Sequence, residues 1–234
     1  MRIDYRCVLV LLAACMGNAA DVLRLQAPEL PPYVFQRDRK LDGMGWRVVS
    51  AALDRAGLAY TTSYVPDFGR IEHDLGSGAS DGFFVATANA ERDRLAELSE
   101  PVLISNWCWV FPASSPMDPK SADFRQKALV GTYLKTNLHT WLKEHDYQVI
   151  GATSKLGSLV KMLDAGRINT VFSIRDVFED SLRSEGKDPA NYRFVSEQQR
   201  PLGIYISKRY LAKHPDTMNR LNSAIHAIKS EAAR

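Results

Sequence analysis

Residue types that can do catalysis are present in this chain, but the motifs of zinc proteases, S-x-x-K enzymes and phosphate-binding loops are incomplete. The five histidines lack the H-E-x-x-H spacing of zinc proteases, and no cysteine pair is spaced to hold zinc. Ser158 and Lys161 fit the pattern S-x-x-K, but no S-D-N or K-T-G accompanies them. Gly76-Ser77-Gly78 lacks the Lys and the Ser or Thr of a phosphate-binding loop. We therefore predict no catalytic residue, no metal site and no cofactor.

Two polar residues, Thr136 and Asn137, stand where a helix is expected to begin. Free backbone N–H groups and the helix dipole attract an anion at such a position. Plain capping of the helix by a Thr or Asn side chain explains the same two residues equally well. The pair is therefore a candidate anion site and, with equal weight, a helix cap.

The composition is that of an ordinary globular protein. The chain has 234 residues, of which 45% are hydrophobic and 24% charged, and its formal net charge is +3. These values exclude a disordered chain, a collagen, a coiled coil and a disulfide-dense small protein. Because Lys and Arg form no long run, we expect no nucleic-acid partner.

Residues 1–20 have the pattern of a secretory signal peptide. A basic start precedes an unbroken apolar run at 7–15, which is too short to cross a bilayer. Cleavage near residues 19–20 would release the protein, whereas residues 12–15 resemble a lipobox in which Cys15 would be lipidated. In both cases we predict a periplasmic protein. The third cysteine, Cys108, lies in an apolar stretch and is expected to be a buried, inert thiol.

Strands and helices alternate along the rest of the chain. Residues 22–27 alternate apolar and polar, which indicates a strand, and residues 46–56 have an apolar helical face. Further strands are expected at 60–65, 82–86, 107–111, 128–132, 147–150, 169–173, 193–195 and 203–207. Further helices are expected at 71–75, 90–98, 137–144, 155–163, 175–183 and 216–231. Two such blocks predict an α/β fold with two lobes, and a cleft between lobes favours a ligand site.

Four stretches follow one another in a characteristic order. The first is LRLQAPELPPYVF with LDGMGWRVVSAALDRAGL, and the second is VPDFGRIEHDLGSGASDGFFVATANAERDRLAELSEPV. The third is LVGTYLKTN with MLDAGRINTVFSI, and the fourth is PLGIYISKRY with HPDTMNRLNSAIHAI. Together they resemble the bacterial family 3 extracellular solute-binding proteins, the amino-acid-binding-like receptors of ABC importers.

This resemblance implies a periplasmic-binding-protein-like fold of type II, with two α/β lobes, two hinge strands and a ligand cleft between the lobes. Carried onto this chain, the first lobe comprises residues 21–101 and 202–234, and the second lobe residues 107–196. The hinges then fall near 102–106 and 197–201.

The resemblance also implies ligand-binding residues. The Arg that holds the ligand carboxylate in the family matches Arg92, and a guanidinium fork suits a carboxylate. Asn89 takes the place of a family Thr, and Thr87 lies on the turn before it. Tyr33 matches the aromatic residue that covers a ligand face, and Arg70 matches an Arg of some branches that points into the cleft.

One departure from the family concerns the group that pairs with an amino acid's ammonium. The acidic residue that ends this strand in amino-acid binders is replaced here by Ile174, which cannot stabilise a desolvated ammonium. Asp176 stands two residues further on and can compensate only if the helix turns it inward. Lys135 also replaces a small residue of the turn. An ordinary α-amino acid is therefore a doubtful ligand, and a carboxylate or another small polar molecule fits better.

The resemblance leads to a periplasmic, monomeric binding protein without catalytic activity. It would capture a small polar ligand by lobe closure and pass it to the membrane subunits of an ABC importer or to a sensor. A secreted dehydratase acting on cyclohexadienyl acids is the alternative, with Glu29, Asp42 or Asp176 as its acid or base. A non-transport member that binds a protein partner is the third option.

Overall fold

The computed structural model describes residues 22–66 and 68–232. The predicted signal peptide and the lipidation of Cys15 lie outside the described residues. The described chain contains one nine-stranded sheet and one two-stranded sheet. In sheet order the main strands are β4 (Tyr60–Tyr64), β1 (Leu23–Ala27), β5 (Gly82–Ala86), β11 (Tyr192–Ser207), β7 (Leu103–Pro112), β10 (Thr170–Ile174), β8 (Leu129–Tyr133) and β9 (Gln148–Thr153), with β6 (Ala96–Leu98) on β11. The small sheet is the hairpin of β2 (Phe35–Arg37) and β3 (Lys40–Asp42).

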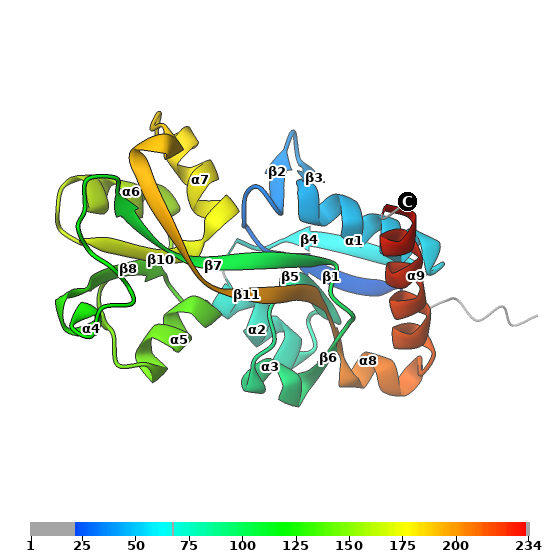
Figure 1. Ribbon diagram of the computed structural model, residues 1–234. Helices are drawn as coiled ribbons and strands as arrows, with labels where there is room; N and C mark the ends of the chain where they lie inside the picture. The colour runs from blue at the N-terminus through cyan, green and yellow to red at the C-terminus, as the bar shows by residue number, and fades with distance from the viewer. Residues whose placement is uncertain (1–21, 67, 233–234) are drawn as a thin grey trace, which may run out of the picture.

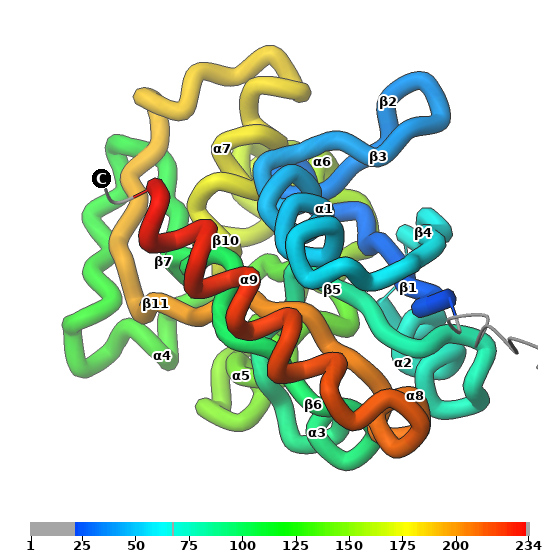
Figure 2. Tube along the Cα trace, turned by 90° about the vertical axis from the view of Figure 1, so that its right-hand side faces the viewer, coloured from blue at the N-terminus to red at the C-terminus, as the bar shows by residue number. Residues whose placement is uncertain are grey.

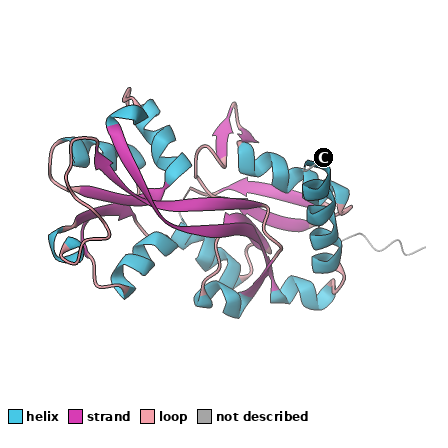
Figure 3. Ribbon diagram, viewed as in Figure 1, coloured by secondary structure: helices cyan, strands magenta, loops and turns pink. Residues whose placement is uncertain are grey.

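Helices cover both faces of the sheet in each half of the molecule (Figures 1 and 3). We call the part built on β1, β4, β5 and β6 the first lobe, and the part built on β8, β9 and β10 the second lobe. The first lobe carries α1 (Met44–Arg55), α2 (Phe68–Ser77), α3 (Ala90–Leu95), α8 (Lys208–Lys213) and α9 (Thr217–Ala232). The second carries α4 (Phe124–Lys127), α5 (Asn137–Glu144), α6 (Leu156–Asp164), α7 (Arg175–Ser184) and a 3-10 turn, η1 (Pro189–Asn191). Figure 2 shows α9 running beside α1, against which it packs.

Two antiparallel strands, β7 and β11, run from one lobe to the other (Figure 1). They pair from Tyr192 opposite Pro112 to Leu202 opposite Leu103. Beyond that point β11 leaves β7 and pairs with β5 and β6. The segments expected to be hinges are therefore paired with each other, while the residue limits of the lobes stay a prediction.

The apolar core is continuous between the lobes. Its largest cluster of buried side chains extends from Leu53 in the first lobe to Phe172 in the second. Smaller clusters, which include Phe83 in the first lobe and Phe178 in the second, lie apart from it. Cys108 belongs to the second-lobe cluster, is 1% exposed, and has a pKa raised to about 12, chiefly because burial disfavours its thiolate. The prediction of a buried thiol is confirmed, and the raised pKa is consistent with low reactivity.

Most expected elements are confirmed within a few residues, including β5 and α5 at the predicted bounds. Two expectations are wrong. The helix expected at 90–98 ends at Leu95, because Ala96–Leu98 pair with β11 as an edge strand. The strands expected at 193–195 and 203–207 are parts of one strand, because β7 also pairs with the polar residues between them. In the described ranges no helix is long and apolar enough to cross a membrane.

Candidate functional site

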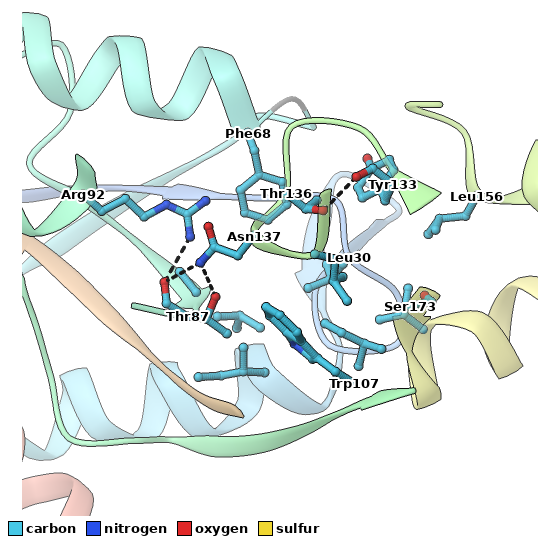
Figure 4. A pocket seen from close by; sticks show the side chains of 16 residues that line it. Leu30, Phe68, Thr87, Arg92, Trp107, Tyr133, Thr136, Asn137, Leu156 and Ser173 are labelled. Carbon is cyan, nitrogen blue, oxygen red and sulfur yellow. Dashed lines mark hydrogen bonds between the residues drawn. The ribbon is translucent and has the colours of Figure 1, made fainter. Parts of the chain in front are cut away.

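A cavity of about 40 Å3 lies where the two lobes meet (Figure 4). The first lobe contributes Thr87 and Arg92 to its wall, the second lobe Asn137 and Ile174, and β7 contributes Trp107. Most of the other wall residues are aliphatic or aromatic, and of the described residues that line the cavity Arg92 alone is charged. The volume holds ~3 water molecules, so a larger solute enters only if the lobes separate.

Arg92 is buried at the cavity wall, with 4% of its surface exposed. The N-cap residue of its helix, α3, is Asn89, whose side-chain oxygen accepts from the Arg92 backbone N–H at 2.8 Å. The Arg92 guanidinium donates to Glu72 at 2.9 Å and to the Thr87 carbonyl at 3.1 Å. It also lies over the faces of Phe68 and Phe83, with its central carbon 5.7 and 5.4 Å from the ring centroids. The cation is thus held firmly at the edge of the cavity.

Asn137 joins the lobes on the side of the cavity where Arg92 lies (Figure 4). Its amide nitrogen donates to the hydroxyl and the carbonyl of Thr87 and to the carbonyl of Ala88, the last two at 3.2 and 3.1 Å. Its oxygen accepts from Asn89 at 2.7 Å. Thr136 caps α5, because its hydroxyl oxygen accepts from the His139 backbone N–H at 3.4 Å. Capping is therefore confirmed for Thr136, while Asn137 bonds across the cleft.

Tyr33 and Asp176 form a second contact between the lobes. The Tyr33 hydroxyl donates to the Asp176 carboxylate at 2.7 Å, and Tyr33 is 1% exposed. Burial, and then the neighbouring carboxylate, raise the pKa of Tyr33. In this arrangement both side chains are used to join the lobes and neither lines the cavity within the described chain.

Ile174 lies against the cavity and is 5% exposed. It is also the N-cap residue of α7 and makes no side-chain cap hydrogen bond. Lys135 is exposed, with a φ of 57°, a left-handed conformation that favours glycine. Lys135 is not part of the described cavity wall. Of these two departures from the family, only Ile174 therefore contacts the cavity.

Arg70 lies apart from the cavity wall that the described residues form. Its side chain is 67% exposed and pairs with Asp74, four residues later on α2, at 2.8 Å. The predicted roles of Arg70, Tyr33 and Asp176 toward a ligand stay predictions. The structure does bring Thr87, Asn89, Arg92, Thr136 and Asn137 together at one edge of the cleft.

The three acids considered for catalysis do not converge. Glu29 is exposed beside Tyr64, Asp42 pairs with Arg37 and Arg47, and Asp176 accepts from Tyr33. None of these acids lines the cavity among the described residues. Among all described residues, no group of acids, histidines and cysteines is arranged to hold a metal ion.

Sequence reasoning missed three residues of interest. Trp107 was expected in a strand but not at the cavity, and Glu72, twenty positions before Arg92, gave no signal. Residues 78–82 read G-x-S-x-G around Ser80, a pattern associated with nucleophilic serines. In a nucleophile elbow the serine lies between a strand and the following helix, whereas Ser80 lies between α2 and β5 and is 1% exposed. The order of elements therefore excludes an elbow.

Comparison with proteins of known structure identifies the fold of the chain. Neither a family model nor a curated protein matches the chain in sequence. A histidine kinase sensor domain with similarity to periplasmic binding proteins aligns over 91% of this chain and 92% of its own, with a TM-score of 0.77 and 16% identity. The chain has the two-lobed periplasmic-binding-protein fold.

Two further solved structures share this fold. ArtJ of Geobacillus stearothermophilus, which binds arginine, lysine and histidine, aligns over 91% of both chains with a TM-score of 0.70 and 15% identity. The GluR0 ligand-binding core of Nostoc punctiforme, solved with L-glutamate, aligns over 90% of this chain and 94% of its own, with a TM-score of 0.73 and 18% identity. At these identities the likeness establishes the fold, and it is consistent with the resemblance to the family 3 solute-binding proteins.

Proposed function

We propose that this protein is a periplasmic solute-binding protein that captures a small, carboxylate-bearing ligand between its lobes. The observation that carries the proposal is the buried guanidinium of Arg92 at the cavity wall. Its fork of N–H donors matches a carboxylate. The Glu72 side chain that pairs with Arg92 is 32% exposed, so it can turn to solvent while a ligand carboxylate takes its place.

Lobe closure is the proposed mode of capture. The lobes already meet through Asn137 and through Tyr33, and both contacts must part before a solute can reach Arg92. We propose that they part by bending of β7 and β11 near 102–106 and 197–201, and that ligand favours the closed arrangement. The first lobe would then comprise residues 21–101 and 202–234, and the second residues 107–196.

Delivery to an ABC importer or to a membrane sensor is the proposed use of the captured ligand. The similar folds include the substrate-binding protein of an amino acid ABC transporter as well as the histidine kinase sensor domain. Binding without turnover fits better than a dehydratase, because the described cavity wall carries no acidic side chain that would act as acid or base.

Thermal-shift screening against amino acids, organic acids and polyamines tests the proposal. We expect a carboxylate to raise the melting temperature of the wild-type protein, because a ligand that binds only the folded state stabilises it. The variant Arg92→Ala is expected to lose this response entirely. Absence of any stabilising compound in the whole panel would refute the proposed function.

The variant Arg94→Ala is the matched control. Arg94 lies on the same helix, two residues from Arg92, and its side chain is exposed. We expect it to keep the full carboxylate response. A response that survives in Arg92→Ala would show that the ligand binds elsewhere, and Arg70→Ala would then test the second predicted arginine.

A further inference from the structure

The cavity wall also limits the kind of ligand, given the function proposed above. We propose that the ligand is a small carboxylate with an apolar body, without an ammonium group, and with an uncharged oxygen that accepts a hydrogen bond from Trp107. A 2-oxo acid with an aliphatic or aromatic side chain has this chemistry. Three features of the cavity lead to this class: the absence of an acid from its described wall, the position of Ile174, and the indole nitrogen of Trp107.

The described wall of the cavity offers no acid to pair with an ammonium. This wall contains no carboxylate, and two of the acids that contact or adjoin wall residues already have partners. Glu72 pairs with Arg92, and Asp176 accepts from the Tyr33 hydroxyl. An ammonium closed into this space would lose its water without gaining a counter-charge, which is strongly unfavourable.

Ile174 occupies the position from which an acid would face the cavity. As the N-cap of α7 it stands where Asp, Asn, Ser and Thr are preferred, because their side chains accept from the free amides of the helix. The chain keeps an aliphatic residue here, without a side-chain cap, and packs it against the cavity. Leu156 and Val177 extend the same apolar wall from the second lobe.

Trp107 offers a hydrogen-bond donor that no described residue uses. Its side chain lines the cavity and is 2% exposed, and its indole nitrogen is buried without a partner among the described residues. A buried N–H without an acceptor is costly, and an oxo oxygen would satisfy it. An ammonium group only donates hydrogen bonds, so it cannot do so.

Two sets of compounds with constant carbon skeletons test the proposal. The first set is valine, 2-oxoisovalerate and isovalerate, and the second is phenylalanine, phenylpyruvate and hydrocinnamate. Dissociation constants for all six are measured by calorimetry at neutral pH. We expect the 2-oxo acid of at least one set to bind on the order of tenfold or more tighter than its amino acid, with the saturated acid between them.

The amino acids binding as tightly as their 2-oxo acids would overturn the proposal while leaving the proposed function intact. If none of the six compounds binds while another compound of the broad panel binds through Arg92, the proposed ligand class is also wrong and the proposed function stands. Failure of the whole panel would instead refute the proposed function itself. Equal binding of the 2-oxo and the saturated acids would remove Trp107 from the proposal.

The variant Ile174→Asp tests the role of the apolar wall in the opposite direction. Asp is a favoured N-cap residue, so the change suits the start of α7 while it adds a negative charge to the cavity. We expect the variant to lose 2-oxo acid binding and to gain amino acid binding. The variant Ile174→Asn has a similar shape and caps α7 without charge, and it should gain no amino acid binding. An unchanged ligand preference in Ile174→Asp would show that Ile174 does not set specificity.

Discussion

The two contacts that join the lobes differ in chemistry, although both cross the same cleft. At one contact the uncharged amide of Asn137 makes four hydrogen bonds with Thr87, Ala88 and Asn89, and two of its acceptors are backbone carbonyls. At the other a single hydrogen bond joins the Tyr33 hydroxyl to the carboxylate of Asp176. The first contact contains no ionisable side chain, whereas the second depends on the Tyr33 hydroxyl, whose pKa is raised by burial.

The two contacts are also expected to respond differently when a ligand binds. The Asn137 contact lies beside Arg92 and is the one that a ligand on Arg92 must disturb. The Tyr33 contact involves buried and partly buried groups that do not line the cavity, so it can persist with ligand present. We therefore expect both contacts to open when a ligand enters, the Tyr33 contact to form again on closure, and the Asn137 contact to be the one that the bound ligand alters.

Replacement of Asn137 is expected to have the largest effect on the free protein. The variant Asn137→Ala removes four hydrogen bonds across the cleft, and we expect a loss of about 2 kcal/mol in the free energy of unfolding. The lobes should also separate, because no other side chain of α5 is shown bonding to Thr87. Urea unfolding measures the first effect, and the radius of gyration from small-angle scattering measures the second.

The variant Asn219→Ala is the control for this change. Asn219 is exposed on α9, outside the described cavity wall, so its replacement should leave both the stability and the radius of gyration near the wild-type values. A wild-type radius of gyration in Asn137→Ala would show that the Tyr33 contact alone holds the lobes together.

Replacement of Tyr33 is expected to have a smaller effect. The variant Tyr33→Phe removes one hydrogen bond, and we expect a loss of about 1 kcal/mol in urea unfolding. Tyr192→Phe is the matched control, because Tyr192 donates to Asp164 at 2.6 Å within the second lobe. Both variants should lose stability, but Tyr33→Phe alone should weaken binding of the ligand. Equal ligand affinity in the two variants would contradict a role of Tyr33 in closure.

The pH dependence of the Tyr33 contact is the smallest expected effect. The pKa of Tyr33 is raised in the folded protein, by burial first and by Asp176 second, whereas in the unfolded chain it lies near 10. The resulting stabilisation is complete up to about pH 9 and is lost as the pH rises further, with about 0.4 kcal/mol already lost at pH 10. The stability difference between wild type and Tyr33→Phe should therefore be constant from neutral pH to about pH 9 and shrink above it. A difference that stayed constant above pH 10 as well would contradict the raised pKa of Tyr33.

The sequence predicts the parts of this molecule that depend on local pattern. The uninterrupted apolar run of β5 and the helical face of α5 are local features, and both elements have the expected bounds. Arg92 was assigned through the resemblance to the family 3 solute-binding proteins, whose carboxylate-holding Arg it matches. The partners of these residues were not found, because they come from distant positions: Asn137 lies 48 residues from Asn89, and Tyr33 lies 143 from Asp176.

The same limit explains the two errors in the secondary structure. Residues 96–98 continue the helical pattern of α3, but pairing with β11, more than a hundred positions away, makes them a strand. Residues 196–201 are polar and contain a proline, yet they extend β11 because β7 pairs with them. Hydrogen bonding between distant segments overrides local pattern in both cases.

The continuous pairing of β7 with β11 makes the connection between the lobes a two-stranded ribbon rather than a pair of loose linkers. Such a ribbon twists and bends without breaking its hydrogen bonds, and it resists sliding of one lobe past the other. Its register shifts between Ser196 and Gln198, and an irregularity of this kind bends a strand and increases its twist. The lobes should therefore rotate as two rigid bodies by twisting of this ribbon, with the rotation concentrated beside Glu197.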